Sequence, residues 1–590
     1  MCGIFAYVGK SDNAAAIVFE GLKRLDYRGY DSWGVGILKN ESLRVEKRVG
    51  VVDRASVKLP RSSIAIGHTR WATNGAVTVA NAHPHYASDR SFILAHNGIA
   101  ENFAIRKEEL IKKRYRFVSE TDTEVIVRQI EEERKRTPTL AEAVRSAFKT
   151  FTGRNTIILL SRDGQMIAAR NGSPLVVGVN DNFSEIYLSS DTLSFAPRVS
   201  QIIVLDNGQM VTVFDNKVST FDIKTGRKVR YLLEKNTILD SSVDKKGHKH
   251  FMIKEIYEEP LVINRIIEQP SSIYRNFAKA ITKAAHVYCI GSGTAGKAAA
   301  QIAYYLRTLG KIPAVSLIGA EAQDYISLIG KNDLLIAPSQ SGETADVLEV
   351  MEAVKKKGTK IASFVNMPGS MMTRLSDYKF MAEAGPEICV MSTKIFVSQL
   401  AWGYCMAKAA SEKLDEGKSA LRILSDRIDR FLHSEEKIAQ IKRLAKALAA
   451  KHDIFLLGKG QNLQIVNEGM VKMIEGSYLH AHAIPAGDLK HYAITLMEPG
   501  VPVIFVISND TVKTDVLNAL HEVKARGAHI IAIAPRREKS FDEYIEVPDL
   551  GDVSAMMNIV PLQVLAYYMA VVLGHNVDKP RNIAKSVTVK

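Results

Sequence analysis

A pattern of buried strand, glycine-rich loop and helix occurs twice in the second half of this 590-residue chain. His286 to Ile290 leads into Gly291-Ser292-Gly293, and Asp453 to Leu457 leads into Gly458-Lys459-Gly460. Each copy continues with another apolar strand, a helix and a further strand. Strands that alternate with helices in this way form parallel sheets covered on both faces. The pattern therefore predicts an internal duplication of one doubly wound α/β unit.

The first part of the chain is typical of a different architecture. A helix is expected after Ser11, with Ile17, Leu22 and Leu25 on one face and Gly29 at its end. Short apolar or alternating segments then lie between Gly, Asn and Asp turns, at residues 35–38, 63–67, 91–95, 156–160, 165–169, 175–179 and 202–205. These segments predict an αββα sandwich of two sheets with outer helices.

The change of pattern sets the predicted domain boundaries. A chain of this length holds roughly three or four domains. Residues 240–250 are polar and lack periodicity, which indicates a linker. We therefore predict a sandwich domain, a linker, two α/β domains and a closing tail, at residues 1–239, 240–250, 251–430, 431–575 and 576–590.

Composition narrows the class of function. The net charge is +14, but the basic residues are scattered along amphipathic segments, which favours anionic small-molecule substrates over nucleic acid. The four cysteines lie far apart without a CxxC pair, so neither a disulfide framework nor a metal site is expected. No apolar run reaches the roughly 18 residues of a membrane span, and no signal segment is recognised. These features favour a cytoplasmic enzyme without a membrane contact.

Cys2 is the candidate nucleophile. If Met1 is removed, Cys2 carries a thiol and a free α-amine on one residue. An α-amine titrates at about 8 and a thiol at about 8.5, so the amine can accept the thiol proton at neutral pH. This arrangement suits amide cleavage. The alternative is a small buried residue that begins the strand Ile4 to Val8, and this stretch alone leaves both interpretations open.

Five polar clusters follow that packing does not require. They are Tyr27 to Ser32, Gly67 to Gly75, Asn81 to His85, His96 to Gly98 and Ser119 to Glu124. In this order they resemble the motifs of the glutamine amidotransferases of the N-terminal-nucleophile type. The resemblance implies that Cys2 is the nucleophile and that L-glutamine is a substrate.

The chemistry of that reaction assigns roles within the clusters. Asn97, through its side chain, and Gly98, through its backbone N–H, would stabilise the tetrahedral oxyanion. Glutamine is a zwitterion, so one fixed cation and one fixed anion are needed. The family motifs imply that Arg70 binds the α-carboxylate and that Asp122 binds the α-ammonium group.

The same resemblance adds three residues and shows two departures. Thr73 and His83 would line the glutamine pocket, and Trp71 would gate the path of ammonia. Asn74 stands where the family usually has His, and Trp33 stands where a small residue is usual. The departures concern details of the pocket and not the reaction.

The first glycine loop in the second half fits two nucleotide-binding motifs incompletely. Gly291 to Lys297 fits GxxxxGK, but Ala298 follows in place of the Ser or Thr that would hold Mg²⁺. Gly291 to Gly296 fits GxGxxG, but Glu321 is only a loose candidate for the ribose-binding acid. A nucleotide cofactor is therefore not expected.

A second loop, Ser339 to Thr344, follows a strand and precedes a helix predicted over 345–356. Hydroxyls and backbone N–H groups at a helix N-terminus bind a phosphate monoester without a metal. The loop resembles the signature of sugar isomerase domains, which occur in tandem pairs, and the stretch Val390 to Lys394 fits the same family. The resemblance implies a sugar-phosphate site made of Ser292, Thr294, Ser339, Gln340, Ser341, Thr344, Val390 and Ser392.

The second copy carries a candidate acid–base pair. Lys472 and Glu475 are three residues apart, on a helix predicted over 463–474 and its last turn, so they share a face. The alternative is a surface ion pair. His480 and His482 are expected in a turn between elements and not in a metal site.

The tail, residues 577–590, resembles that of isomerising amidotransferases that act on ketose phosphates, and this resemblance covers the entire chain. It implies that Lys585 forms a Schiff base with the C2 carbonyl of the open-chain ketose. It also implies that His491 assists ring opening and that Glu475 moves a proton between C1 and C2, with Lys472 nearby.

The resemblance as a whole implies transfer of the amide nitrogen of L-glutamine to fructose 6-phosphate, with isomerisation to glucosamine 6-phosphate. It implies a homodimer and no cofactor. Two alternatives stay open: the same architecture acting on another keto sugar phosphate, and a sugar-phosphate sensor without catalysis. Sugar affinity is in question because of departures at Ala295, His482, Asp488, Tyr492 and Ala493.

Overall fold

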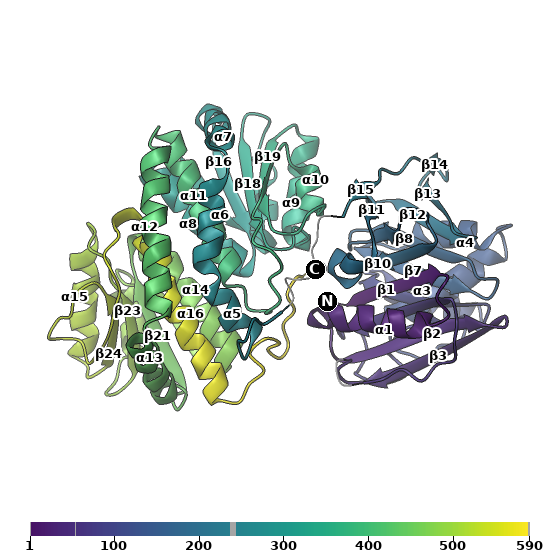
Figure 1. Cartoon of the computed structure of the whole chain (residues 1–590), viewed down its shortest axis with the longest axis horizontal. Helices are drawn as coiled ribbons and strands as arrows, with labels where there is room; N and C mark the ends of the chain where they lie inside the picture. Colours follow the sequence, from purple (N-terminus) through teal and green to yellow (C-terminus); the bar gives the residue numbers. More distant parts are fainter. Residues whose placement is uncertain (1, 53–54, 237–243, 588–590) are drawn as a thin grey trace. The chain divides into compact units, whose positions relative to one another are not determined.

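The computed structural model describes residues 2–52, 55–236 and 244–587 (Figure 1). Its contacts divide the chain into two compact units, residues 1–242 with 584–590, and residues 243–583. The division falls within the segment predicted as a linker, part of which lies outside the described residues. The described part of that segment, residues 244–250, contains neither helix nor strand.

Two antiparallel sheets form the core of the first unit. The eight-stranded sheet has the order β15-β11-β9-β10-β1-β4-β2-β3, and the seven-stranded sheet has the order β14-β13-β12-β8-β7-β6-β5. The strands of the first sheet are β1 (Gly3–Gly9), β2 (Ser32–Lys39), β3 (Ser42–Val49), β4 (Ile64–Arg70), β9 (Val176–Val179), β10 (Glu185–Ser189), β11 (Gln201–Val204) and β15 (Glu234–Lys235). Those of the second are β5 (His85–Tyr86), β6 (Phe92–Gly98), β7 (Asn155–Ser161), β8 (Met166–Asn171), β12 (Gln209–Phe214), β13 (Lys217–Asp222) and β14 (Lys228–Val229).

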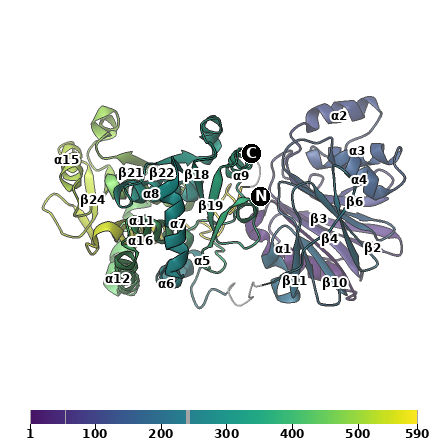
Figure 2. The ribbon, with the colours of Figure 1, turned by 90° about the horizontal axis from the view of Figure 1, so that it is seen from above.

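Helices cover the outer face of each sheet. Successive side chains of a strand point to opposite faces. In β1, Ile4 and Ala6 join the core between the sheets, whereas Phe5 and Tyr7 pack against α1 (Ala14–Arg24). The seven-stranded sheet is covered by α2 (Phe103–Lys112), α3 (Asp122–Arg134) and α4 (Leu140–Phe148), which Figure 2 shows on one side of the strands. The predicted αββα sandwich is confirmed.

Two parallel five-stranded sheets organise the second unit. Their orders are β17-β16-β18-β19-β20 and β22-β21-β23-β24-β25, so the same arrangement occurs twice and the predicted duplication is confirmed. The first sheet contains β16 (Val287–Gly291), β17 (Ala314–Ile318), β18 (Leu334–Ser339), β19 (Lys360–Val365) and β20 (Tyr378–Met381). The second contains β21 (Asp453–Gly458), β22 (His480–Pro485), β23 (Pro502–Val506), β24 (His529–Ala534) and β25 (Glu543–Glu546).

The helices of this unit join both sheets into one hydrophobic core. That core contains Cys289 of β16 and Leu456 of β21 together with most of the last helix. The helices are α5 (Phe251–Tyr257), α6 (Glu259–Glu268), α7 (Ser271–Lys283), α8 (Gly293–Thr308), α9 (Ala345–Lys356), α10 (Met371–Leu375), α11 (Lys394–Ala410), α12 (Leu414–Leu432), α13 (Glu435–Leu448), α14 (Leu463–Ser477), α15 (Lys513–Lys524) and α16 (Ser554–Val572).

The last helix corrects one expectation. No segment was expected to reach the length and hydropathy of a membrane span, yet the 22 residues Gly551–Val572 do so. Within the unit, 83% of the apolar window is buried. Its apolar surface is therefore covered by the protein's own core, where α16 packs beside α14.

The prediction that His480 and His482 lie in a turn is wrong. Both residues belong to β22, an edge strand that pairs in parallel with β21, and both side chains are exposed. Edge strands are half-exposed and carry no continuous apolar run, so sequence patterns find them poorly. The other edge strands of the two parallel sheets, β17, β20 and β25, were not predicted for the same reason.

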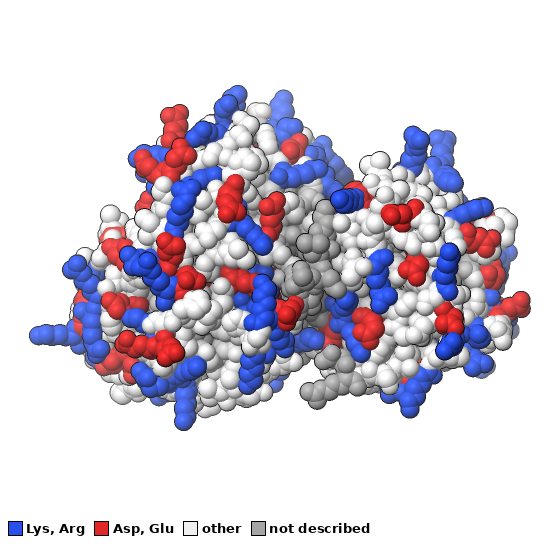
Figure 3. Space-filling view, viewed as in Figure 1, with Lys and Arg blue, Asp and Glu red and all other residues white. Residues whose placement is uncertain are grey.

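The basic excess is not gathered into one patch on the face in view. Figure 3 shows Lys and Arg side chains interspersed with Asp and Glu on each unit. Many form surface ion pairs, such as the contacts of Lys355 and Lys360 with Asp377 at 2.8 and 2.9 Å.

Candidate active sites

Strand pairing places Cys2 beside the end of β4. The antiparallel register sets Gly3 opposite Thr69, so Cys2 lies at the end of β4, where Arg70 and Trp71 follow. The Trp71 backbone N–H donates to the Cys2 Sγ at 3.2 Å, and the thiol lies 3.5 Å from the Trp71 carbonyl oxygen. The position of the sulfur is therefore fixed by backbone groups.

The Cys2 carbonyl is held as well. It accepts hydrogen bonds from the Asn97 Nδ2 at 3.1 Å and from the Arg28 Nε at 3.4 Å. Asn97 thus contacts the predicted nucleophile itself, and its role toward an oxyanion stays a prediction. Gly98 follows with a φ of +133°, and a Cβ there would lie 2.0 Å from the Arg154 carbonyl oxygen. Only glycine fits at this position.

Electrostatics link Cys2 to both predicted glutamine ligands. Burial raises the pKa of the Cys2 thiol, while the amino-terminal charge, the Trp71 N–H and the Arg70 charge oppose this shift. The Asp122 charge raises the pKa further. The thiol is therefore neutral at rest and needs a base, which is the function that an α-amine on Cys2 could supply.

The loop that follows Trp71 wraps around the buried Arg70 guanidinium. Arg70 donates to the carbonyl oxygens of Asn74, Gly75 and Ala76 at 2.6, 3.1 and 3.1 Å. Thr73 lies exposed on this loop. The Asn74 side-chain Nδ2 is buried and has no hydrogen-bond partner among the described residues.

Asp122 is the first residue of α3 and is buried. The preceding residue, Thr121, caps the helix by accepting from the Glu124 N–H at 3.3 Å. The Asp122 Oδ2 accepts from the Ala100 N–H at 2.9 Å and lies 3.9 Å from the His96 Nδ1. A carboxylate is thus fixed at a helix N-terminus, where negative charge is stabilised.

His83 belongs to a buried histidine cluster formed with His68, His85 and His96. Its Nε2 lies 3.0 Å from the Thr123 Oγ1, and its Nδ1 accepts from the His96 N–H at 3.4 Å. These contacts hold the ring within the core, and its predicted contact with glutamine stays untested by them.

His68 is a residue of the site that sequence reasoning did not single out. Its Nε2 lies 2.9 Å from the His96 carbonyl oxygen and 3.1 Å from the Asn97 Oδ1. Because both neighbours are acceptors, the Nε2 carries the proton and the ring orients the Asn97 amide. Burial lowers the pKa of His68 to about 3, so the ring stays neutral. Its place within the Gly67 to Gly75 motif was the one available signal.

The core position of Trp33 accounts for one departure from the family pattern. Its side chain is 1% exposed and lies 5.0 Å from the Phe19 ring of α1, between centroids. The large ring therefore fills the layer between α1 and the eight-stranded sheet.

The predicted phosphate loops lie at the switch point of the first parallel sheet. β16 and β18 are neighbours there, and ligands bind beyond the carboxyl ends of such strands. Ser339 accepts from the Gly342 N–H at 2.9 Å, and Ser341 accepts from the Glu343 N–H at 3.2 Å. Thr344 is the N-cap residue of α9.

The remaining predicted sugar-phosphate residues have the following contacts. Ser292 is the N-cap residue of α8, and its Oγ is buried without a partner among the described residues. The Gln340 carbonyl oxygen accepts from the Asn366 N–H at 3.2 Å. The Val390 N–H donates to the Asp578 carbonyl at 3.0 Å, and Ser392 donates to Glu387 at 2.8 Å.

The predicted acid–base pair is part of a triad on α14 in which Lys472 and Glu468 are buried and Glu475 is partly exposed. The Lys472 Nζ lies 2.5 Å from the Glu475 Oε2 and 3.4 Å from the Glu468 Oε1. Thr294 of α8 donates to the same Glu468 oxygen at 3.0 Å. The Lys472 side chain is 0% exposed and that of Glu475 is 23% exposed, so the pair is not the solvent-exposed surface ion pair considered as an alternative.

Burial and neighbouring charges shift the pKa values of Glu468 and Lys472 in this triad. Burial and the charge of Glu475 raise the pKa of Glu468 to about 7 against the opposing effect of Lys472. Burial disfavours a charged Lys472, but the Glu475 and Glu468 carboxylates outweigh it and raise its pKa. A carboxyl group that titrates near neutrality beside a fixed cation is suited to proton transfer. Glu468 was not predicted from the sequence.

The other two predicted catalytic residues belong to other segments of the chain. His491 is exposed at the end of a short 3₁₀ turn, Leu489–His491. Lys585 belongs to the segment Ala584–Lys590, which groups with the first unit, whereas the triad belongs to the second. Their shared site stays a prediction. No group of three metal-ligating side chains occurs within the described ranges.

Comparison with known proteins defines the class. Residues 1–212 match the class-II glutamine amidotransferases, and residues 280–409 and 447–573 match the SIS domain. The chain is therefore a class-II amidotransferase domain joined to two SIS domains.

Curated relatives match over the full length of both chains. Glutamine–fructose-6-phosphate aminotransferase [isomerizing] of Thermococcus kodakarensis is 37% identical over 608 residues, and that of Thermus thermophilus is 37% identical over 613 residues, each with 100% of both chains covered. The solved C-terminal domain of glucosamine-fructose-6-phosphate aminotransferase from Francisella tularensis is 29% identical, with a TM-score of 0.51, and covers 57% of this chain and 100% of its own. The chain belongs to the family of isomerizing glutamine–fructose-6-phosphate aminotransferases.

The buried histidines predict a loss of stability in acid. His68 has a folded pKa of about 3, below the unfolded value near 6.5, so the unfolded state binds more protons between these values. The unfolding free energy of the first unit should fall as the pH drops from 7.5 to 5, by up to about 1.4 kcal/mol per pH unit from this residue. His68→Gln should be less stable than wild type at pH 7.5, but its unfolding free energy, measured by urea unfolding at each pH, should depend less steeply on pH.

The exposed His433 provides the matched control. His433→Gln should retain the wild-type pH slope. An equal slope in wild type and His68→Gln would contradict the assignment of a neutral buried ring.

Proposed function

We propose that this chain hydrolyses L-glutamine at Cys2 and uses the released ammonia to convert fructose 6-phosphate into glucosamine 6-phosphate. The observation that carries the proposal is the placement of Cys2 against the Trp71 N–H and the Asn97 amide, within the fields of Arg70 and Asp122. Full-length similarity to relatives named for this reaction supports it. The chain acts as a homodimer in the cytoplasm and needs no cofactor.

The glutaminase step proceeds through a thioester. The Cys2 α-amine takes the thiol proton, and the thiolate attacks the carboxamide carbon of glutamine. The oxyanion that forms is stabilised by the Asn97 amide and the Gly98 N–H. Collapse expels ammonia with the proton from the α-amine, and water then releases glutamate from the thioester.

Glutamine is selected by its two charged groups. The Arg70 guanidinium binds the α-carboxylate, and the Asp122 carboxylate binds the α-ammonium group. His83 and Thr73 complete the pocket. Both ionic ligands are rigid because Arg70 is enclosed by its loop and Asp122 is fixed at the start of α3.

The sugar half binds the phosphate at the loops around Ser339 and Ser292 and carries out chemistry at C1 and C2. His491 assists ring opening. The Lys585 amine condenses with the C2 carbonyl and releases water, and ammonia then displaces the lysine. Glu475 removes a proton from C1 and returns one to C2, which leaves an amine at C2 and an aldehyde at C1.

The nucleophile provides the first test. Cys2→Ala should abolish glutamine hydrolysis, because the attacking thiol is lost, while fructose 6-phosphate still protects the second unit against thermal unfolding. A glutaminase assay and a thermal-shift assay measure the two effects. Cys2→Ser is the conservative control and should be strongly impaired. Glutamate release by Cys2→Ala at the wild-type rate would remove Cys2 from the mechanism.

The Schiff base provides the second test. Lys585→Arg keeps the positive charge but cannot supply a neutral amine, so amino-sugar formation should vanish while glutamine hydrolysis continues. Borohydride reduction of wild-type protein with fructose 6-phosphate should add the sugar mass to Lys585, read by peptide mass spectrometry. Labelling of another lysine would overturn this assignment.

Coupling between the two reactions provides the third test. Trp71 lies directly after Arg70, and its ring packs at right angles to Tyr30 with centroids 5.6 Å apart. If this ring gates the ammonia path, Trp71→Ala should release more glutamate than amino sugar, whereas Trp71→Phe should keep the ratio near one. Equal loss of both products in Trp71→Ala would identify Trp71 as a packing residue.

A further inference from the structure

A closed set of hydrogen bonds joins Asn81 to Glu120, which are far apart in sequence. The Glu120 N–H donates to the Asn81 Oδ1 at 2.9 Å, and the Asn81 Nδ2 donates to the Glu120 Oε2 at 2.9 Å. Both residues also hold Ala76. Its N–H donates to the Glu120 Oε2 at 3.0 Å, and its carbonyl accepts from the Asn81 Nδ2 at 2.9 Å. We name Asn81 and Glu120 the latch.

On one side the latch fixes the loop around Arg70. The Ala76 carbonyl that Asn81 holds also accepts from the Arg70 Nη1 at 3.1 Å. Gly75 has a φ of +82°, and a Cβ there would lie 2.8 Å from the Glu120 Cβ and 2.9 Å from the Asn81 Nδ2. The loop therefore packs against the latch without room for a side chain at Gly75.

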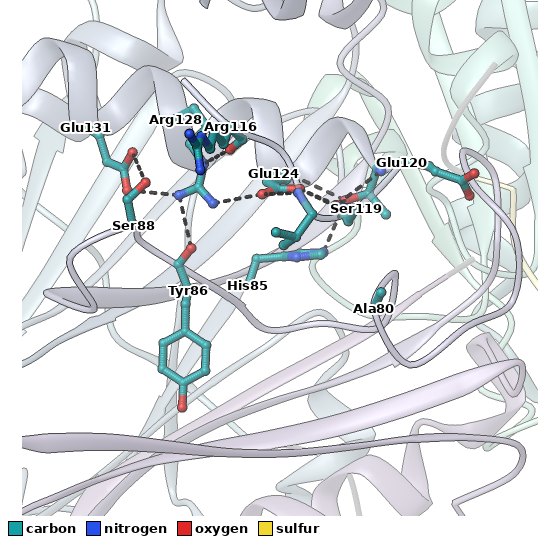
Figure 4. A network of polar contacts seen from close by, with 12 residues as sticks. Ala80, His85, Tyr86, Ser88, Arg116, Ser119, Glu120, Glu124, Arg128 and Glu131 are labelled. Atoms are coloured by element: carbon teal, nitrogen blue, oxygen red, sulfur yellow. Dashed lines mark hydrogen bonds and ion pairs between the residues drawn. The ribbon is translucent and has the colours of Figure 1, made fainter. Parts of the chain in front are cut away.

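On the other side the latch is anchored next to Asp122. Glu120 lies two residues before Asp122, in a segment held by buried charges (Figure 4). The Glu124 carboxylate accepts from the Ser119 N–H and Oγ, each at 2.7 Å, and from the Arg128 Nη2 at 2.7 Å. Arg128 also contacts Glu131 at 3.0 Å. This network makes the segment a fixed base for the latch.

We propose that Asn81 and Glu120 are positioning residues that set the separation between Arg70 and Asp122 and thereby select free α-amino acids. The inference rests on the proposed glutaminase function. A carboxylate and an ammonium group on one carbon have a fixed separation, so a displaced Arg70 loop loses one of the two ionic contacts. A displacement of about 1 Å can lower the efficiency of an enzyme by about 100-fold. We expect substrate binding to weaken, because Asn81 and Glu120 take no part in the contacts between the Cys2 sulfur and Trp71.

The latch offers a conservative variant. Within the described parts of the chain, the Glu120 carboxylate accepts from the Ala76 N–H and the Asn81 Nδ2, both at the Oε2. A single amide oxygen can accept both, so Glu120→Gln should keep the latch and Glu120→Ala should open it. Glu120 is exposed, so its truncation leaves the core intact. Glu109→Ala, which removes an exposed partner of Arg106, is the matched control.

The test compares glutamine hydrolysis by these variants of the full chain. Glu120→Ala should raise the KM for glutamine by about 10- to 100-fold with kcat within about 3-fold of wild type. Glu120→Gln and Glu109→Ala should stay within about 3-fold of wild type in both constants. Inactivation by 6-diazo-5-oxo-norleucine, which carries the same charged groups, should slow in parallel with kcat/KM. Alkylation of Cys2 by iodoacetamide, which lacks them, should not change.

The outcomes separate the two proposals. An unchanged KM in Glu120→Ala, or equal slowing by both reagents, would overturn the positioning role while leaving an active wild type. A lower kcat with an unchanged KM in Glu120→Ala would also overturn the positioning role. A wild type that does not hydrolyse glutamine would overturn the proposed function and this inference together.

Discussion

The antiparallel pairing of β1 with β4 is the constraint on which the glutaminase site depends. It sets Gly3 opposite Thr69, and so Cys2 meets the Trp71 N–H while Arg70 ends the neighbouring strand. The pairing is stable because β1 is buried on both faces, between the two sheets and against α1. A shift of one residue would exchange these faces, so the same packing that stabilises the sandwich also fixes the position of Cys2, the predicted nucleophile.

A buried cation between two carboxylates organises the second unit in a comparable way. Lys472 is 0% exposed, and its charge is retained because Glu475 and Glu468 surround it. Removal of one partner from such a cluster leaves an uncompensated buried charge, which is costly. Glu468 also receives the Thr294 hydroxyl from α8, so the triad joins the two copies of the duplicated fold.

The fold class and the two-part organisation could be predicted because they depend on local patterns. Long apolar strands and glycine loops recur at the same places in both copies, and the helix over Ala345–Lys356 was predicted with its observed bounds. The edge strand β17 was missed because Ser316 interrupts its apolar residues and the strand has only five residues, which is too short a pattern to identify a strand. Its pairing with β16 depends on partners distant in sequence.

In the candidate sites too, residues in local motifs could be predicted, whereas residues whose partners are distant in sequence could not. Arg70 and Asp122 could be predicted as glutamine ligands because family motifs surround them, and the charges of both residues affect the pKa of the Cys2 thiol. Glu468 could not be assigned, since a Glu four residues before a Lys on a helix also describes a solvated ion pair. Its hydrogen-bond partner Thr294 is 174 residues away in sequence. The latch partners are likewise 39 residues apart, and no local pattern joins them.

The most direct test of the account follows nitrogen from one half of the protein to the other. Wild-type protein is supplied with glutamine labelled with ¹⁵N in the side-chain amide, fructose 6-phosphate and an excess of unlabelled ammonium, and the sugar product is analysed by mass spectrometry and NMR. The account predicts glucosamine 6-phosphate that carries ¹⁵N at C2, formed in equal amount with glutamate. Glutamate formed without an amino sugar, or an amino sugar that carries unlabelled nitrogen, would contradict it.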